Sequence, residues 1–396
     1  KINNNINFAL LRKKSDPLLP ENEAKEIVDL INNSPLKISS VVKKPVSVKP
    51  KPPFITSTLQ QAASTKLSFN VKRTMRVAQK LYEAGHITYM RTDAPSLSKE
   101  SIQDARNYVS ENLGEKYLTN APRIYSSTEN AQEAHEAIRP TNAFMESSQL
   151  INVSEEEKRL YSLIWQQYIA SQLPDAQYLS TSAKIDLENY TFTAKGREVV
   201  FDGHTKVSNT ASKDSEDDIL PALEEGDILG LDKVNLDQKF TKPPARFSEA
   251  ALVKELEKKG IGRPSTYASI ISTIQDRGYV EIENRRFFVK KIGHIVAERL
   301  LDSFTDIMDY DFTANLENSL DKVADGDLEW KSVLNNFYSA FQNDLVLASS
   351  DDGGMKSNLP VETDITCPDC SSSTMVIRNS SNGVFLGCSG YNNEGD

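Results

Sequence analysis

The sequence predicts a multidomain protein that is mainly α-helical, with a separate β-rich unit and a small cysteine-containing element near its C-terminal end. Its 396 residues exceed what one hydrophobic core usually supports, and about 100–200 residues per domain gives several compact units. Most of the chain has apolar residues at helical spacing. Residues 178–240 instead alternate apolar and polar residues between glycines, as strands do.

The composition is that of a globular protein without a membrane-spanning segment. Hydrophobic residues make up 38% of the chain and charged residues 26%, and no apolar run approaches the ~20 residues that a membrane helix needs. Three cysteines and no signal-peptide pattern favour a reducing, cytoplasmic setting. Because the chain starts at Lys1 and not at Met, we expect a fragment or a processed chain.

Charge is distributed unevenly along the chain. The net charge of −10 by itself argues against a polyanionic partner. The segment from Leu30 to Tyr82, however, contains no acidic residue and ten basic ones, which are Lys37, Lys43, Lys44, Lys49, Lys51, Lys66, Lys72, Arg73, Arg76 and Lys80. This segregation fits a solvated surface with a linker or a surface that neutralises phosphates, and composition leaves both open.

The first part of the chain predicts short strands followed by helices. Alternating stretches in residues 1–48, with a helix over 21–31, lead to a proline-rich segment around Pro45 and Pro50 that fits neither a regular helix nor a central strand. We place a domain boundary there. Helical spacing over residues 58–84 ends at a glycine. An extended segment over 87–90 follows, and further helices are expected over 99–113 and 154–172.

The second part predicts a β region and then a helical unit. Strands are expected over 180–187 and 190–194, followed by an acidic loop at 214–218. Ser248 has the pattern of a helix N-cap, and a tight turn leads to a second helix over 265–276 and a hairpin over 279–290. Such a helix–turn–helix with a wing either binds DNA or serves as scaffold. Helices over 293–304 and 330–347, and a linker at 351–354, complete the region.

Tyr89 lies just beyond a predicted helix end, in the segment GHITYMRTD at 85–93. In an extended segment residues two apart share a face, so Arg91 could place a permanent cation beside the Tyr89 hydroxyl. Attack of a tyrosine on a phosphodiester needs such charge stabilisation. The competing interpretation is a packed aromatic, since the chain contains fourteen tyrosines.

Three segments resemble the bacterial type IA DNA topoisomerases. Residues 54–109 are similar, nearly continuously, to the active-site segment of that family. The similarity resumes at 131–141, AQEAHEAIRPT, and at 247–271, which contains GIGRPSTYASII. The Pro-Ser-Thr sequence in the last segment is similar to the topoisomerase I branch rather than the topoisomerase III branch.

The resemblance implies roles for individual residues. Tyr89 matches the covalent nucleophile of the family, Arg91 its phosphate-contacting arginine, and His135 the histidine that assists at the scissile phosphate. DNA contacts are implied for Arg91, Asp93, Arg263 and Thr266, the last two through charge and the amides at a helix N-terminus. Ala94 departs from the serine that is common in related enzymes, and we expect little effect, because it follows the reacting group.

The implied reaction is ATP-independent relaxation of negatively supercoiled DNA by single-strand cleavage through a 5′-phosphotyrosine link, strand passage and religation. The sequence contains no Gly-rich P-loop, which agrees with a reaction that uses no ATP. The expected partner is DNA, single-stranded or negatively supercoiled, bound by a monomer associated with the nucleoid. The alternative is a non-catalytic module that binds single-stranded DNA and keeps the fold and the zinc finger.

Metal binding is expected at two places. The whole enzyme is expected to need Mg²⁺, held mainly by an N-terminal metal-binding (Toprim) domain that precedes this chain. The acids at 325–329 fit the Asp-x-Asp-x-Glu pattern of such a site, but we reject them because they lie between amphipathic helices and not at the end of a buried strand.

His135 has no second histidine at helical spacing, so metalloprotease chemistry is unsupported.

The second expected metal is zinc. Cys367 and Cys370 form a Cys-x-x-Cys knuckle, and Cys388 follows at a distance typical of a zinc ribbon. Structural zinc takes four ligands, so we expect a finger whose fourth cysteine lies beyond Asp396. A redox pair or inert thiols are the alternatives.

The family resemblance implies a toroid built from four parts. Residues 1–48 and 176–246 would form a discontinuous β-rich arch, and 49–175 a mainly helical domain that carries the active-site tyrosine. Residues 247–360 would form a helical, winged-helix-like DNA-binding domain, and 361–396 a partial zinc finger. β character on both sides of the helical insert supports the joined arch, although periodicity alone would not connect its two pieces.

Overall fold

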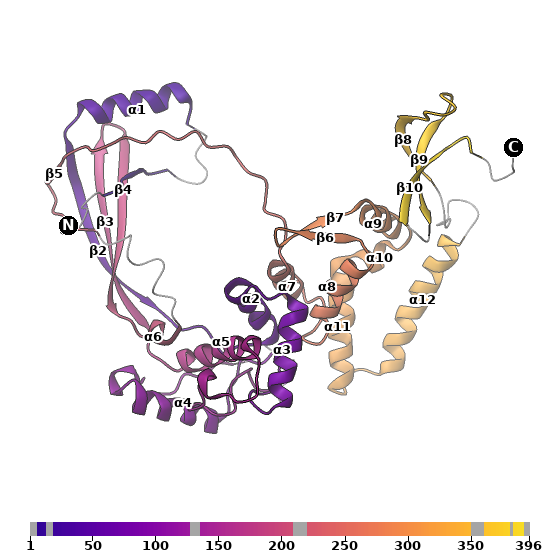
Figure 1. The fold of residues 1–396 in the computed structure, drawn as a ribbon, viewed down its shortest axis with the longest axis horizontal. Helices are drawn as coiled ribbons and strands as arrows, with labels where there is room; N and C mark the ends of the chain where they lie inside the picture. The colour runs from indigo at the N-terminus through magenta and orange to yellow at the C-terminus, as the bar shows by residue number, and fades with distance from the viewer. Residues whose placement is uncertain are drawn as a thin grey trace.

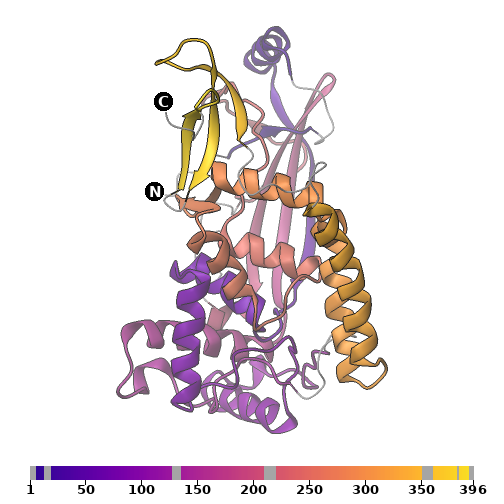
Figure 2. The same cartoon turned by 90° about the vertical axis from the view of Figure 1, so that its right-hand side faces the viewer.

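The computed structural model describes residues 6–12, 19–126, 135–208, 220–349, 360–380 and 383–391. Its ribbon traces a ring-like outline, in which a long sheet stands on one side and two helical units occupy the base and the other side (Figure 1). A small three-stranded sheet stands apart at the C-terminal end of the chain (Figures 1 and 2). The expectation of a mainly helical protein with a β-rich arch is therefore confirmed.

The arch is one antiparallel sheet made of segments that are far apart in the sequence. Its strand order is β1-β4-β3-β2-β5, with bounds Ala9–Leu10 (β1), Leu36–Val48 (β2), Ala176–Leu187 (β3), Tyr190–Phe201 (β4) and Ile228–Leu229 (β5). Helix α1, Glu21–Asn33, packs on one end through Ile27, against a core that includes Ile38 and Ile185. Because β2 pairs with β3 over most of its length, the N-terminal segment is tied to residues more than one hundred positions away.

Strand β2 continues through Pro45 and ends at Val48, just before Pro50. Beyond residue 37 the outer edge of β2 has no described strand beside it, so Pro45 lies in an edge strand and its missing N–H breaks no ladder. One expectation about the arch was wrong. Residues 230–246 were expected to be β-rich, but in the described chain they contain no strand and run as an extended connection back to the helices (Figure 1). The acidic loop at 214–218 lies outside the described residues.

The unit that carries Tyr89 is helical. Its α-helices are α2 (Thr56–Leu67), α3 (Val71–Glu83), α4 (Lys99–Asn112), α5 (Glu155–Ser171) and the short α6 (Thr205–Ser208), with 3₁₀ turns at Glu115–Tyr117 and Ser147–Gln149. The single helix expected over 58–84 is two helices. Ser68 adopts a left-handed conformation with φ 61°, and the Asn70 side chain accepts a hydrogen bond from the Arg73 amide to cap α3. The apolar spacing hid this break because Phe69 and Val71 are both buried.

The remaining helices form a second unit that leads to the small sheet. Their bounds are α7 Glu249–Lys258, α8 Tyr267–Asp276, α9 Lys291–Ser303, α10 Thr305–Met308, α11 Tyr310–Ala324 and α12 Trp330–Ala348. The expected wing is the hairpin β6 (Val280–Glu283) and β7 (Arg286–Val289), and Ser248 caps α7 as its position indicated. The small sheet contains β8 (Val361–Thr366), β9 (Thr374–Ser380) and β10 (Gly383–Cys388). The linker expected at 351–354 lies outside the described residues.

No helix in the described part of the chain combines the length and the apolar character that crossing a lipid bilayer requires.

Helix α7 closes the ring by packing against α2 and α3. The Glu249 carboxylate accepts a hydrogen bond of 2.9 Å from the Val71 amide, at the N-terminus of α3. At the other end of α7, Glu257 accepts a hydrogen bond from the Ser57 hydroxyl on α2. Between them, Val71 shares an apolar cluster with Val253 and residues of α8. The two helical units therefore meet through a mixed polar and apolar contact, although the chain joins them only by way of the arch.

The Glu249 contact predicts a local effect on α3. A carboxylate that accepts an N-terminal amide of a helix stabilises the helix by about 0.5–2 kcal/mol, so Glu249→Ala should speed amide exchange of the first turn of α3 roughly two- to thirtyfold. Hydrogen–deuterium exchange followed by mass spectrometry measures this directly. Glu255→Ala, on the same helix, is the matched control. Equal exchange at residues 71–74 in both variants would show that the Glu249 contact does not hold α3.

Candidate functional site

Tyr89 stands on an extended segment that begins where α3 ends. Gly85, with φ +75°, supplies the left-handed residue that terminates the helix, as the sequence indicated. The segment then pairs with residues 138–141: Ile87 forms a β-bridge with Pro140, and the Thr88 amide donates to the Arg139 carbonyl at 2.9 Å. The backbone next to Tyr89 is thus fixed by a neighbouring segment and not only by the helix.

Burial alternates along this segment as the sequence predicts for an extended chain. Met90 and Thr92 are each only 1% exposed, whereas Tyr89 is 41% exposed and Arg91 is exposed. The Thr56 hydroxyl lies between the carbonyls of Met90 and Thr92, at 2.9 and 3.0 Å, and anchors the buried side. Tyr89 and Arg91 therefore project from the same, open side, and Tyr89 is not a packed core aromatic.

The ring of Tyr89 has one aromatic neighbour in the preceding helix. Tyr82 meets it edge to face, with ring centroids 5.3 Å apart and planes at 66°. Tyr82 is itself 40% exposed. The contact orients the Tyr89 ring without burying it, so the phenol is open to a substrate.

His135 is brought next to Asp93 by a separate segment. The His135 carbonyl accepts a hydrogen bond from the Ser96 hydroxyl at 3.2 Å, and the Ala137 amide donates to the Ser96 carbonyl at 2.8 Å. His135 Nδ1 then lies 3.8 Å from Asp93 Oδ1. Two of the residues singled out in the sequence, forty-two positions apart, thus face each other. Residues 131–134 of the matched segment lie outside the described residues.

Glu136 and Arg139 lock the segment that presents His135. The Glu136 carboxylate receives two hydrogen bonds from the Arg139 guanidinium, at 2.7 and 3.1 Å, and further ones from the Ser98 amide and the Ser101 hydroxyl. Burial alone would raise the pKa of Glu136, but these hydrogen bonds and the Arg139 charge hold the pKa below its ordinary value. This pair was not predicted from the sequence, although the i, i+3 spacing of its opposite charges is visible there.

Arg263 and Thr266 form the turn before α8, as expected, but the Arg263 side chain is already engaged. Its guanidinium lies 2.6 Å from Asp321 and 3.8 Å from Glu317, both on α11. The Thr266 hydroxyl accepts from the Arg263 amide at 2.8 Å, which fixes the turn. An incoming phosphate would have to share or displace these carboxylates at Arg263.

Tyr267 connects this turn to the Tyr89 unit. It is 5% exposed, and burial, reinforced by the charge of Glu257, raises its pKa to about 12. The charge of Asp93 acts in the same direction. Thr56, which anchors the Tyr89 segment, is followed by Ser57, whose hydroxyl donates to Glu257 on α7, so this segment lies near the contact between the two helical units.

The basic stretch that precedes Tyr89 divides into two parts in space. On α3, Arg73 and Arg76 pair with Glu156 and Lys80 with Glu157, because the acidic first turn of α5 lies alongside. The lysines of β2 and its extension, in contrast, are exposed and include Lys43, Lys44, Lys49 and Lys51. Much of the charge on α3 is thus balanced within the fold, which the one-dimensional charge pattern could not show.

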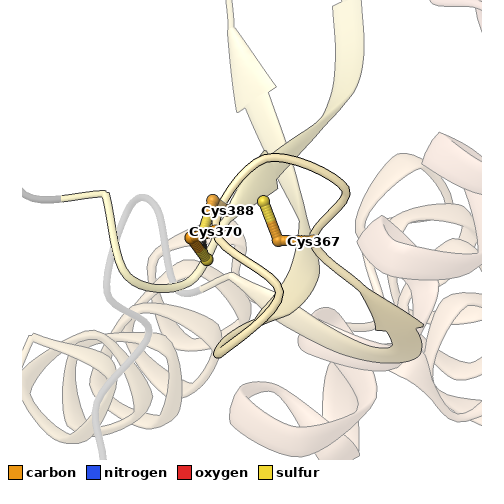
Figure 3. A group of neighbouring side chains, drawn as sticks. All are labelled: Cys367, Cys370 and Cys388. Atoms are coloured by element: carbon orange, nitrogen blue, oxygen red, sulfur yellow. Dashed lines mark hydrogen bonds between the residues drawn. The ribbon is translucent and has the colours of Figure 1, made fainter.

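The three cysteines come together at one end of the small sheet. The Sγ atoms of Cys367, Cys370 and Cys388 lie within 4.8 Å of one another, with Cys370 and Cys388 3.7 Å apart (Figure 3). Hydrogen bonds from the side chain and amide of Ser372, and a smaller effect of the Ser373 amide, lower the pKa of Cys370 to about 6. The lowered pKa favours the thiolate that binds metal. This is the geometry of a zinc ribbon. Among the described residues it is the one cluster of metal-ligating groups, and the acids at 325–329 form none.

Family models define the class of protein. A model described as DNA topoisomerase matches residues 2–335, and one described as topoisomerase DNA-binding C4 zinc finger matches residues 364–393. A solved structure, full-length topoisomerase I from Thermotoga maritima, superposes with a TM-score of 0.82 at 31% identity, covering 98% of this chain and 63% of that one. The fold, including the zinc ribbon, is therefore that of a DNA topoisomerase.

Curated relatives make the assignment specific. The chain is 53% identical over 390 residues to DNA topoisomerase 1 of Pasteurella multocida, and the aligned region covers 98% of this chain and 45% of that protein. It is 52% identical over 379 residues to DNA topoisomerase 1 of Escherichia coli K12, covering 95% of this chain and 44% of that protein. The chain belongs to the bacterial type IA DNA topoisomerase I family, as its sequence resemblance indicated. It spans a little under half the length of these relatives.

The pKa of Glu136 predicts a pH dependence. Because the folded-state pKa is lowered, the contribution of the Glu136–Arg139 pair is present above the ordinary carboxyl range and is lost as pH falls through the folded value. The Arg139 Nε–H resonance should therefore stay constant from neutral pH down to that range and shift below it. Glu136→Gln should remove this transition. A wild-type resonance that shifts at neutral pH would contradict the lowered pKa.

The cysteine cluster predicts tight zinc binding that depends on each thiol. Structural zinc binds with about 10–16 kcal/mol shared among its ligands, so Cys370→Ser should weaken zinc binding by at least about tenfold. Competition against a chromogenic chelator measures this. Ser371→Ala, the neighbouring turn residue, is the control and should bind zinc like the parent chain. Equal affinity in both variants would exclude Cys370 as a ligand.

Proposed function

We propose that this chain carries the DNA-cleaving tyrosine of a type IA DNA topoisomerase, which relaxes negatively supercoiled DNA without ATP. The observation that carries the proposal is the pair Tyr89 and Arg91, which project together from a backbone segment fixed on its buried side. A phenol and a permanent cation on one open face are what attack on a phosphodiester requires. Family membership supports the same activity for the whole protein.

The proposed reaction is a reversible transesterification. The Tyr89 oxygen attacks a backbone phosphorus, the bond from phosphorus to the 3′ oxygen breaks, and the phenolic proton is transferred, by way of His135 or water, to the departing 3′ oxygen. One DNA end is then linked to Tyr89 through its 5′ phosphate, and the other is a free 3′ hydroxyl. After another strand passes through the break, that hydroxyl attacks the phosphotyrosine and releases Tyr89. One phosphodiester replaces another, so no ATP is needed.

The other residues support this chemistry in distinct ways. Arg91 would hold the non-bridging oxygens of the phosphate and balance the charge that develops during attack. His135 would contact the scissile phosphate by a hydrogen bond or proton transfer. Arg263 and Thr266 would hold the DNA backbone at the N-terminus of α8, where helix amides favour an anion. For Arg263 this requires the phosphate to compete with Asp321.

One face of the arch sheet supports DNA as the partner. Paired positions on β2, β3 and β4 place Lys44, Ser180 and Arg197 in one row and Val42, Ser182 and Lys195 in the next. Side chains of paired residues share a face, and the exposed fraction of Val42 is 42%, so this face is open. Lysine, arginine and serine are the residues that contact DNA phosphates and sugars. The face therefore has the chemistry of a backbone-binding surface within an otherwise acidic chain.

Metals and setting complete the proposal. Zinc would be held by the three cysteines and a fourth ligand, and would fix the small sheet. The whole enzyme would require Mg²⁺, which the family resemblance assigns mainly to an N-terminal metal-binding domain. We propose a monomer acting on single-stranded or negatively supercoiled DNA in the cytoplasm, associated with the nucleoid.

Covalent trapping tests the proposal. A labelled single-stranded oligonucleotide is incubated with the chain, with and without an added N-terminal metal-binding domain from a relative, and denatured adducts are resolved on a gel. Tyr89→Phe should abolish the adduct, since no other group would supply the attacking oxygen. Tyr82→Phe is the matched control because the Tyr82 ring touches Tyr89 and is equally exposed; it should keep the adduct.

Two results would overturn the proposal. An adduct that persists in Tyr89→Phe would place the nucleophile elsewhere. Oligonucleotide binding without any adduct, even with the metal-binding domain added, would favour the non-catalytic single-strand binding module.

A further inference from the structure

We propose that Asp93 is a positioning residue for His135: its carboxylate accepts the Nδ1–H of the imidazole and thereby presents Nε2 to the DNA phosphate at Tyr89. The inference rests on the proposed function and gives Asp93 a role other than the direct DNA contact that the family resemblance implies. It identifies a residue that acts through His135 and not on the substrate.

The two facing atoms of His135 and Asp93 have no other hydrogen-bond partner among the described residues. His135 Nδ1 and Asp93 Oδ1 lie 3.8 Å apart, and both are buried without a hydrogen-bond partner. Leaving a buried polar atom unsatisfied costs about 1–3 kcal/mol, so each atom needs the other. A small rotation of either side chain shortens the separation to hydrogen-bond length, and contacts of this kind are often long until substrate binds.

The imidazole of His135 is exposed on the side away from Nδ1. The His135 side chain is 35% exposed, although its Nδ1 is buried. The exposed surface therefore belongs to the rest of the ring, which includes Nε2. The Asp93 side chain is likewise 32% exposed, with Oδ1 turned inward. The pair thus has an inner edge, where the two residues meet, and an outer edge open to a ligand.

The backbones of Asp93 and His135 are both anchored. Asp93 lies between Thr92 and Ala94, which are buried, and the Ala94 amide donates to the Thr92 hydroxyl at 3.1 Å. His135 is held through its carbonyl by Ser96 and is followed by Glu136, whose carboxylate is fixed by four hydrogen bonds. Side-chain rotation is therefore the main freedom left to the pair.

Charge also favours a positioning role for Asp93. A carboxylate placed directly against a DNA phosphate would repel it, whereas one that faces the inner edge of an imidazole supports the histidine. Burial raises the pKa of Tyr267, and the charges of Glu257, Asp93 and Glu317 raise it further, so Asp93 belongs to an acidic environment. Arg91, two residues earlier in the chain, remains the group suited to the phosphate itself.

The expected consequence is a fixed tautomer. A carboxylate that accepts from Nδ1 keeps the proton of the neutral ring on that nitrogen and leaves the Nε2 lone pair free to accept the phenolic proton during attack, after which Nε2–H can donate to the phosphate or the departing 3′ oxygen; the orienting carboxylates of other histidine sites act in the same way. Replacing the carboxylate by an amide allows the amide N–H to donate to Nδ1. The ring proton then moves to Nε2. The imidazole keeps its position, but its Nε2 no longer carries a free lone pair.

The tautomer can be read directly by ¹⁵N NMR of the chain. At about pH 8, where an imidazole is neutral, His135 should show a protonated Nδ1 in the parent chain and shift toward a protonated Nε2 in Asp93→Asn. His86, His204 and His294 serve as internal controls, and unchanged signals from them show that the variant is folded. Asp93→Glu restores a carboxylate and should return part of the Nδ1–H signal. An unchanged His135 tautomer in Asp93→Asn would overturn the proposal, whether or not any adduct forms.

Kinetics separate positioning from DNA contact. General acid–base groups contribute about 10²–10⁴-fold, so Asp93→Asn should slow covalent adduct formation by at least about tenfold, with oligonucleotide affinity within about twofold of the parent chain. Asp93→Glu should recover part of the rate. Asp276→Asn, at the far end of α8, is the matched control and should react like the parent chain. Weakened oligonucleotide binding with an unchanged rate at saturation would instead make Asp93 a DNA contact and overturn the positioning role.

Discussion

The contact of α7 with α2 and α3 is the interaction on which the arrangement of this molecule depends. The chain leaves the Tyr89 unit, runs through the arch and returns along the extended segment at 230–247, so no peptide bond links the two helical units directly. Glu249 and Glu257 bridge them by hydrogen bonds, and a small apolar cluster lies between. These polar and apolar contacts fix how the two units lie against each other.

The residues that we propose as catalytic lie near this contact of α7 with α2 and α3. Tyr89 and Arg91 project from the same extended segment as Asp93. Thr56 anchors this segment, and its neighbour Ser57 contacts Glu257 on α7, so the segment lies near the contact between the two units. In the proposed reaction, a DNA strand held by the second unit would lie near Tyr89 in the first.

Electrostatic balance within the fold decides which charges remain for DNA. Two carboxylates in the first turn of α5 pair with Arg73, Arg76 and Lys80, and α11 supplies two carboxylates to Arg263. Lys43 and Lys44 on β2 and Lys195 and Arg197 on β4 remain exposed. Net charge alone would have argued against a nucleic-acid partner, because it averages over these separate surfaces.

The sequence by itself determined the helix ends at Gly85 and Ser248, the shared face of Tyr89 and Arg91, the cysteine knuckle and the family. These are local signals, set by backbone conformation, side-chain period and residue spacing over a few positions. Only the tertiary structure decided that a separate helix, α3, follows the Asn70 cap, that β2 runs through Pro45, and that Glu136, next to His135, binds Arg139. It alone placed Asp93 against His135, because that approach depends on the pairing of two segments whose separation no local pattern encodes.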